Sequence, residues 1–355
     1  MNTRLFLREK TTPPVQSNNT HQTTEIVMPH TGGPNILQKR KRDLPPAKAD
    51  EVRVRVEAAG FSFAEVQMLR GRYFNQPRFP FVPGYDLVGT VTDVGPGVSD
   101  LAVGKRVAAL TETGSWAENV VLPAEKLVPV PDNLDPADTV AVVTNGVTAR
   151  QMLHRVARVQ PGQTVLVHGA SGGVGTLLMQ LARIARVDVI GTASASKHDL
   201  VRSLGATPLD YRTDDVPARV RELEPNGVDA VFDHVGGPGL ADSWRLLAPG
   251  GTLVSYGVAS ALEAKGHRLL PFVPLLARLL LWKAIPNGRQ ATFYYVQRWP
   301  QHFEDDLTAV LALLAKGQID TAIDRRVPLS EASDALRLLD SRRASGKVVL
   351  VSEDS

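Results

Sequence analysis

The stretch that most constrains the fold is TVLVHGASGGVGTLLMQLAR, which runs from Thr164 to Arg183. A six-residue strand-like run, TVLVHG, is followed by a turn rich in glycine and then by apolar residues at helical spacing. This order is typical of the start of a βαβ unit, where missing side chains let the backbone approach a pyrophosphate. The turn reads AxGxxG from Ala170 and lacks the usual first glycine, so a turn that only packs a helix on a strand remains an alternative. Because of its context we expect a dinucleotide here, held by Ser171, Gly172, Gly173, Val174 and Gly175.

The rest of the chain shows two kinds of sequence pattern. From residue 146 onward, apolar strand-like runs alternate with helical ones, which predicts a parallel sheet. From Glu25 to about Asn145, short alternating runs are separated by turns rich in proline and glycine, which predicts a β-rich domain. After residue 286 the pattern is mixed and ends in the strand GKVVLVS, which we expect to return to the first domain. The predicted division is a disordered extension over 1–23, a catalytic domain over 24–145 and 287–355, and a dinucleotide domain over 146–286.

The composition of the chain argues against several classes of function. The 40 Lys and Arg residues nearly balance 37 Asp and Glu, so charge gives no argument for nucleic acid, and the basic run QKRKRD at 38–43 is expected to be a solvated face. The chain has no cysteine, which excludes disulfides, cysteine nucleophiles and thiolate zinc sites. The N-terminus lacks the apolar run of a secretory signal, so we expect a cytoplasmic location, with an organelle transit peptide left open.

The apolar stretch LLPFVPLLARLLLWKAIP, residues 269–286, is interrupted by prolines and an arginine. We expect it to pack in a core or against a partner subunit, without stable membrane insertion.

The end of the next strand indicates which dinucleotide binds. NAD sites usually place Asp or Glu about 20 residues after the glycines, but VDVIGTA ends in SASKH. Ser194 and Lys197 offer a hydroxyl and a cation that suit a 2′-phosphate, and Tyr211 with Arg212 follows the third strand. We therefore expect NADPH. The alternative is that Lys197 only begins a solvated helix.

Several segments resemble the medium-chain dehydrogenase/reductase superfamily, most closely its zinc-free quinone oxidoreductase and enoyl reductase branch. They include GVTARQMLHRVARVQPGQTVLVHGASGGVG, VDAVFDHVGG and, in the first domain, PFVPGYDLVGTVTDVGPGVSDLAVGKRV. The resemblance covers nearly all of the chain after the N-terminal tail. It implies an α/β protein with a GroES-like β-rich domain plus a Rossmann doubly wound parallel-sheet domain, an active site in the cleft between them, and a homodimer.

The zinc alcohol dehydrogenases of that superfamily provide a test for metal. At the positions corresponding to their ligands this chain has Ser62, Tyr85 with Asp86, and Thr144, of which only Asp86 suits zinc. Because catalytic zinc needs three protein ligands, we expect no metal site. Hydride transfer to a quinone or another α,β-unsaturated carbonyl compound then becomes the favoured reaction. The candidate catalytic hydroxyls are Ser62, Thr144 and Tyr73, with solvent as a competing proton donor and a half-buried structural role as the alternative for Tyr73.

The resemblance and the position of strand ends also indicate contacts of the cofactor. His234, Val235 and Tyr256 follow later strands and are expected to line the nicotinamide half. Five further residues are considered: Asn145 and Thr148 where the domains join, Phe293 and Tyr294 in a returning loop, and Lys347, which matches a family lysine but is equally explained as a surface side chain. A second reading of the chain is an NADP-binding adaptor or sensor with little turnover, which uses residues 269–286 for a protein partner or a membrane.

Overall fold

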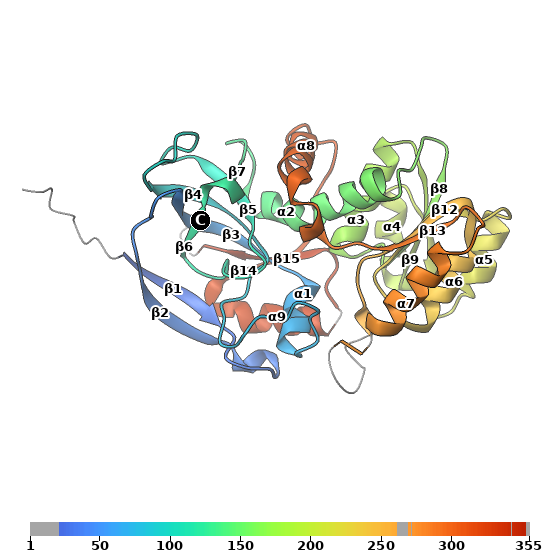
Figure 1. Ribbon diagram of the computed structural model, residues 1–355, viewed down its shortest axis with the longest axis horizontal. Coiled ribbons are helices and arrows are strands. Elements are labelled where there is room, and N and C mark those ends of the chain that lie inside the picture. Colours follow the sequence, from blue (N-terminus) through green and yellow to red (C-terminus); the bar gives the residue numbers. More distant parts are fainter. Residues whose placement is uncertain (1–20, 261–268, 271, 342, 353–355) are drawn as a thin grey trace, which may run out of the picture.

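The computed structural model describes residues 21–260, 269–270, 272–341 and 343–352, and Figure 1 shows two lobes side by side. Most of the predicted N-terminal extension lies outside the described residues. Its last three residues do not, because the first strand already begins at His21. Thr23 and Thr24 are buried in that strand, so pairing with a neighbouring strand orders residues whose polar sequence favours disorder.

The first lobe is a twisted β structure. Its seven-stranded sheet has the order β14 (Ile323–Pro328), β15 (Lys347–Val351), β3 (Glu51–Phe61), β4 (Asp86–Val94), β5 (Arg106–Leu110) and β7 (Val128–Pro129), with β6 (Asn119–Pro123) also paired to β3. Two short helices, α1 (Phe63–Leu69) and α9 (Ala332–Asp340), lie against each other beside it. Strands β14 and β15 come from the end of the chain, so the C-terminal segment contributes to this sheet.

The second lobe is a six-stranded parallel sheet. Its order is β10 (Thr207–Asp210), β9 (Asp188–Ala193), β8 (Thr164–His168), β11 (Val228–Asp233), β12 (Leu247–Ser255) and β13 (Gln290–Phe293). Its helices are α3 (Gly173–Ile184), α4 (His198–Ser203), α5 (Val216–Leu223), α6 (Leu240–Arg245) and α7 (Phe272–Lys283). The chain order reverses between β8 and β11, which is the switch point where open parallel sheets bind dinucleotides. The structure confirms the predicted combination of a GroES-like domain and a Rossmann-type domain.

Strand β13 differs from the predicted division at residue 286. It pairs with β12 at the edge of the parallel sheet, so this sheet extends to Phe293. An edge strand has one neighbour and needs no long apolar run, so RQATFYY gave no strand pattern. After β13 the chain passes through α8 (Phe303–Ala315) back to the first lobe.

Helix α2 (Pro136–Arg150) connects the lobes. It begins with Asp135 as its N-cap and packs on α3 and α8 as well as on β3 and β4. Nearly all of its residues are buried, which explains why VAVVTNGVTA shows no amphipathic period. A π-helical turn over Gln151–Val156 continues it. Side chains on α2 are therefore fixed with respect to both lobes.

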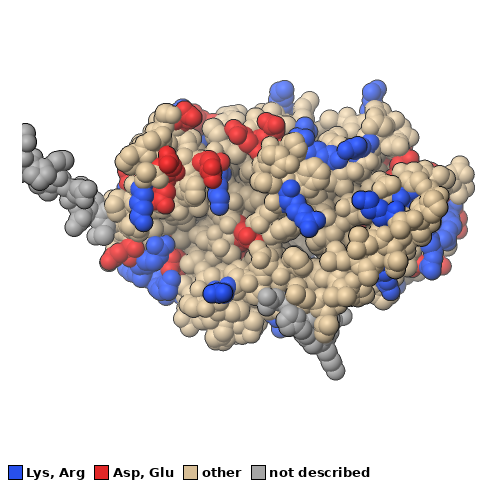
Figure 2. Space-filling model, in the orientation of Figure 1, with Lys and Arg blue, Asp and Glu red and all other residues tan. Residues whose placement is uncertain are grey.

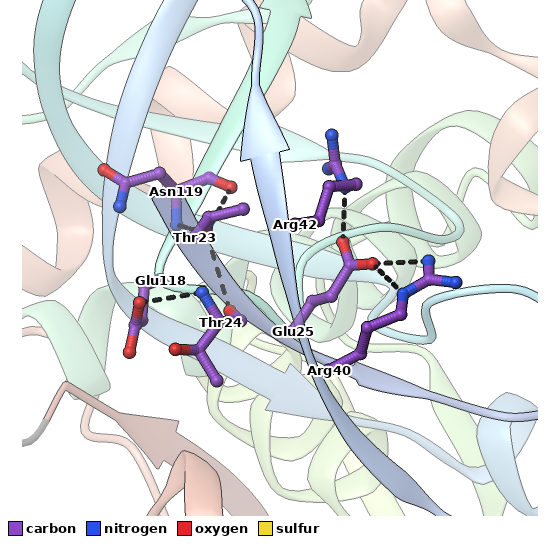
Figure 3. Close-up of polar contacts among 7 residues, drawn as sticks. All are labelled: Thr23, Thr24, Glu25, Arg40, Arg42, Glu118 and Asn119. Atoms are coloured by element: carbon purple, nitrogen blue, oxygen red, sulfur yellow. Dashed lines mark hydrogen bonds and ion pairs between the residues drawn. The ribbon is translucent and has the colours of Figure 1, made fainter. Parts of the chain in front are cut away.

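The basic run lies in an outer hairpin of β1 (His21–Val27) and β2 (Gln38–Leu44). Every residue of β2 except Leu44 is exposed, as predicted for a solvated face. Figure 3 shows Glu25 between two arginines: Arg40 Nε and Arg42 Nε each lie 2.9 Å from a carboxylate oxygen of Glu25. Charged side chains on an outer strand also discourage pairing with another chain. In Figure 2, side chains of both signs are spread over the face shown.

Candidate active site

The glycine turn joins β8 to α3 at the switch point. Gly169 has φ +70°, and Gly172 is the N-cap of α3, which has no side-chain cap. A Cβ on Gly175 would lie 2.5 Å from the carbonyl oxygen of Gly169 and 2.7 Å from that of Ala170, so only glycine fits. No side chain therefore caps the first turn of α3, where the helix dipole favours negative charge, and Gly172 forms an isolated backbone bridge with Gly346.

Three predicted cofactor residues gather around this turn. Asn145 on α2 lies so close to Gly173 that a Cβ there would come within 2.4 Å of Asn145 Nδ2. The ring of His234 covers Gly169, with Nδ1 3.1 Å from the carbonyl oxygen of His168, and its centroid lies 5.9 Å from that of Tyr256. Val235, next to His234, is exposed. The structure therefore brings together residues from α2, β11 and β12 beside one turn.

The residues predicted for the phosphate of the adenosine ribose follow β9 and β10. Lys197 is half-buried, and its Nζ donates to the carbonyl oxygen of Ala344 at 2.8 Å. Burial lowers the pKa of Lys197, the charge of the nearby Asp324 opposes this shift, and that of Arg212 adds to it. Ser194 Oγ lies 3.4 Å from Ser196 Oγ, and Tyr211 is exposed with the Arg212 guanidinium 5.5 Å from its ring centroid. Two cations and two hydroxyls thus lie near one end of the sheet.

One carboxylate, that of Asp210 at the end of β10, lies near the residues predicted to hold the 2′-phosphate. Its oxygens accept hydrogen bonds from the backbone amides of Ala195 at 3.1 Å and Arg212 at 2.9 Å. Asp210 is buried, so it holds the loops together from inside.

Of the two aromatic residues predicted in the returning loop, only one remains near the surface. Phe293 is half-buried, 6.2 Å from Phe272 between ring centroids. Tyr294 is buried and donates to Gln151 Oε1 at 2.8 Å, and Gln151 in turn donates to Asp306 at 2.9 Å. Thr148 is buried on α2, and its contact with Tyr294 slightly opposes the rise that burial causes in the pKa of that tyrosine. The hydroxyl of Tyr294 therefore fastens the loop to α2, and its role as a cofactor contact stays a prediction.

Ser62 serves as the N-cap of α1. Its Oγ accepts from the amide of Ala64 at 3.2 Å and donates to Glu65 Oε2 at 2.5 Å. The amide of Ser62 donates to the same carboxylate oxygen at 2.8 Å. This is a capping box, a pattern that stabilises helix starts. Burial raises the pKa of the fully buried Glu65 to about 7, although the Ser62 hydrogen bond and the charge of Lys347 oppose the shift. The Ser62 hydroxyl, which the sequence predicted to be catalytic, is thus hydrogen-bonded within the N-terminal cap of α1.

Asp86 and Lys347 form a buried ion pair behind this helix. Lys347 Nζ lies 3.1 Å from Asp86 Oδ2, and both side chains are almost completely shielded from solvent. The backbone amide of Thr144 donates to the same oxygen at 3.3 Å. A Cβ on Gly60 would lie 2.1 Å from Asp86 Oδ1, so glycine makes room for the pair. The surface interpretation of Lys347 was wrong, because a carboxylate 261 positions away neutralises it in the interior.

The side chains at the positions of the zinc ligands decide whether this site suits a metal ion. Ser62 caps a helix, Asp86 is paired with an ammonium, and Thr144 Oγ1 is a buried hydroxyl without a partner. Among the residues that the structure describes, no group of three His, Asp or Glu side chains is arranged to hold a metal ion. The donor set at the former ligand positions therefore does not fit tetrahedral zinc.

Tyr85, which directly precedes Asp86, belongs to a group of hydrogen-bonded tyrosines. Tyr73 Oη is 2.8 Å from Tyr85 Oη and 3.4 Å from Tyr295 Oη. Tyr295 donates to Glu112 Oε1 at 2.9 Å. Burial raises the pKa of both Tyr73 and Tyr85 above the ordinary range of tyrosine. The predicted Tyr73 is thus part of a larger hydrogen-bonded group, which for brevity we call the tyrosine cluster: Tyr73, Tyr85, Tyr295 and Glu112.

Residues 48–132 match the family model of the alcohol dehydrogenase GroES-like domain, and residues 204–350 match that of zinc-binding dehydrogenases. The rat synaptic vesicle membrane protein VAT-1 homolog is 34% identical over 338 residues, which cover 92% of this chain and 83% of that protein. The chain belongs to the medium-chain dehydrogenase/reductase superfamily.

Within the superfamily the similarity includes enzymes of the quinone oxidoreductase branch. The crystal structure of Escherichia coli quinone oxidoreductase complexed with NADPH superposes with a TM-score of 0.83 and 25% identity, covering 92% of this chain and 99% of that one. The 2-haloacrylate reductase of a Burkholderia species is 30% identical over 330 residues, 90% of this chain and 96% of the enzyme. These relatives make the chain an oxidoreductase of this superfamily.

Sequence reasoning missed Glu65, Glu112 and Tyr295, and considered Tyr85 only as a replaced ligand. One sequence signal was present for Glu65, because Ser62 and Glu65 have the Ser-x-x-Glu spacing of a capping box. The segment around Tyr295 is extended, with φ −144° and ψ 122°, so neighbouring side chains point to opposite sides. Of the adjacent Tyr294 and Tyr295, only one could therefore face the interior of the loop.

Proposed function

We propose that this protein reduces quinones or other α,β-unsaturated carbonyl compounds with NADPH and without zinc. The observation that carries the proposal is the use of the former ligand positions: Ser62 caps α1, and Asp86 is neutralised by Lys347. Without a Lewis acid, an electron-poor conjugated double bond is the acceptor that takes hydride most directly. A relative named for haloacrylate reduction and another named for quinone reduction support this substrate class.

The residues around the glycine turn fit NADPH. The uncapped amides of α3 would hold the pyrophosphate, and Lys197 with Arg212 would hold the 2′-phosphate. Asn145, His234 and Tyr256 would line the nicotinamide half. When bound, the cofactor supplies the hydride. The protein's part is to orient it toward the first domain, exclude water and supply a proton at the enolate.

We also propose a homodimer built on the edge of the parallel sheet. Strand β13 ends the order of that sheet among the described strands, and α7 packs beside it. Helix α7 buries Phe272, Leu275 and Leu279 but exposes Val273, Leu280 and Leu281, with 63%, 70% and 68% of their surfaces accessible. An exposed apolar face of this kind marks an interaction surface. Cytoplasmic location stays a prediction.

The same face favours the second candidate function, an NADP-binding adaptor or sensor. In that case α7 would bind a different protein or lie on a membrane surface while the cofactor site turned over slowly. Among the described residues, no helix is long and apolar enough to span a membrane.

The proposal is tested by measuring NADPH oxidation with a panel of quinones and cyclic enones, on protein whose metal content is determined in the same sample. We expect turnover that requires an acceptor, prefers NADPH to NADH and does not depend on zinc. Tight NADPH binding with no turnover on any acceptor would support the adaptor. Turnover that needs one zinc per chain would contradict the proposal.

A further inference from the structure

A chain of hydrogen-bonded side chains lies next to the glycine turn. His168 ends β8, and its ring lies between two hydroxyls: Nδ1 is 3.2 Å from Thr192 Oγ1 on β9, and Nε2 is 3.1 Å from Ser243 Oγ on α6. Ser243 Oγ also lies 2.8 Å from Asp233 Oδ2 at the end of β11. The chain therefore joins three neighbouring strands of the parallel sheet to one helix.

Both ends of this chain bind backbone amides of loops at which the cofactor is expected. At one end, the amide of Gly169 in the glycine turn donates to Thr192 Oγ1 at 3.3 Å. At the other end, the amides of Val235 and Gly236 donate to Asp233 Oδ1 at 2.8 and 2.9 Å. The side chains thus connect the loop after β8 to the loop after β11. These two loops flank the switch point at which open parallel sheets bind dinucleotides.

The direction of each hydrogen bond follows from Asp233. Burial opposes its ionisation, but the charge of His168 and the hydrogen bonds from a backbone amide and from Ser243 lower the pKa of this carboxyl on balance. An ionised carboxylate only accepts, so Ser243 gives its one proton to Asp233 and accepts from His168 Nε2. In the neutral ring, Nδ1 then carries no proton and accepts from the hydroxyl of Thr192, which itself accepts from the amide of Gly169. Every proton in the chain is therefore assigned in one way.

The chain is closed to solvent except at the imidazole. Ser243, Asp233 and Thr192 have 1%, 2% and 3% of their surfaces accessible, whereas His168 is half-buried. A buried polar group that loses its hydrogen bond remains unpaired, which costs free energy. The backbone of His168 also holds His234, whose Nδ1 lies 3.1 Å from the carbonyl oxygen of His168. A change in the chain is therefore expected to move residues that are predicted to contact the cofactor.

We propose that His168, Ser243 and Thr192 are positioning residues for NADPH, which hold the loops after β8 and β11 at the spacing that the bound cofactor requires. This rests on the binding of NADPH in the proposed function. None of the three needs to touch the cofactor, because each acts through a backbone amide or through Asp233. The pyrophosphate expected at the turn after β8 is common to NADPH and NADH. The chain therefore sets the affinity for both cofactors alike and leaves the preference for NADPH to the residues after β9.

The test compares two substitutions of Thr192. Thr192→Val keeps the shape of the side chain but removes the hydroxyl, whereas Thr192→Ser keeps the hydroxyl and removes a methyl group. We expect Thr192→Val to raise the Kd of NADPH and of NADH by the same factor, about threefold to tenfold, the effect of one lost hydrogen bond. Thr192→Ser should stay close to wild type. A role in packing alone predicts the reverse order, because serine leaves a cavity that valine fills.

A second substitution interrupts the chain at its middle hydroxyl. Ser243→Ala leaves His168 Nε2 without its acceptor and should raise the Kd of both cofactors to a similar degree as Thr192→Val. The matched control is Ser203→Ala on α4, where the exposed hydroxyl donates to the carbonyl oxygen of Leu200. This control should bind both cofactors as wild type does.

Nitrogen NMR of protein with labelled histidines reports the proton arrangement directly, with His168→Gln identifying the signal. We expect the proton of the neutral ring on Nε2. A proton on Nδ1 would overturn the assigned direction of the chain. Equal Kd values for wild type, Thr192→Val and Ser243→Ala, or weaker binding by Thr192→Ser than by Thr192→Val, would overturn the positioning role. Absence of NADPH binding by wild type would instead overturn the proposed function itself.

Discussion

The glycine turn and the cluster around Asp86 are built in different ways. The turn is made by the backbone of consecutive residues between β8 and α3, and its form depends on which positions lack a Cβ. The Asp86 cluster is made by the side chains of Asp86 on β4 and Lys347 on β15 and by the backbone amide of Thr144 on α2, which meet only in the folded chain. The first is formed by residues that are consecutive in the chain. The second depends on burial, so changes to it should affect stability more than changes at the turn.

The largest effect is expected from breaking the buried ion pair. Lys347→Met leaves the Asp86 carboxylate buried with a backbone amide as its remaining partner, which should reduce the free energy of unfolding by about 3–5 kcal/mol. Urea unfolding measures this. The double variant Asp86→Asn with Lys347→Met is the control and should recover a large part of the loss. A loss below about 1 kcal/mol in the single variant, the size of a surface ion pair, would show that the pair is not buried in solution.

The next largest effect is a dependence of stability on pH through Glu65. Glu65 has a pKa of about 7 in the folded protein against an ordinary 4.5, so the native state binds the extra proton between these pH values. Stability contributed at this site therefore falls as pH rises from 4.5 to 7 and stays low above it, by an amount on the order of 3 kcal/mol. Glu65→Gln keeps the cap but cannot ionise, so its advantage over wild type in urea unfolding should grow from pH 5 to pH 8. A constant difference would show that Glu65 is ionised throughout.

At the glycine turn, two substitutions distinguish an effect on stability from an effect on NADPH binding. Gly175→Ala places a Cβ against two carbonyl oxygens and should cost about 1–3 kcal/mol of stability. Gly172→Ala meets one atom, at 3.3 Å, and should change stability less while still weakening NADPH, because its backbone lies where the pyrophosphate approaches. Thermal unfolding and NADPH titration distinguish the two effects. Equal stability of the two variants would mean that the turn is looser than its contacts indicate.

The smallest effect is expected at Lys197. Lys197→Glu should lower the affinity for NADPH about tenfold, or 1.4 kcal/mol, with little change for NADH, because only NADPH carries the 2′-phosphate. Lys39→Glu, on the exposed strand β2, makes the same change of charge away from the site. Fluorescence titration of both cofactors measures the ratio. An unchanged preference for NADPH in Lys197→Glu would remove Lys197 from the phosphate site.

Sequence predicted the parts of the molecule that local rules govern. The strand, the glycines and the helix of the turn are consecutive, so periodicity and glycine spacing indicated them together, and the alternation after residue 146 predicted the parallel sheet. The residues after β9 lie at the edge where strands of a parallel sheet end, and their contact with the 2′-phosphate stays a prediction.

Sequence could not predict what depends on distant partners. Nothing local in SGKVVLV shows that Lys347 meets Asp86. The Ser-x-x-Glu spacing in FSFAEV, by contrast, is the local signature of a capping box, and it was missed. Tyr295 joins Tyr73 only because β13 belongs to the second sheet, which its short polar sequence did not indicate. For Lys347 and Tyr295, the side chain's role is set by a contact between elements and not by spacing along one of them.

The central claim is that side chains of the first domain, without zinc, support hydride transfer from NADPH to a conjugated double bond. The most direct measurement follows deuterium from NADPH labelled at C4 into a cyclic enone, with protein whose zinc content has been determined. We predict deuterium at the β carbon of the product at a rate that does not change when metal is removed. Deuterium absent from that carbon, or a rate that rises in proportion to zinc up to one per chain, would contradict the account.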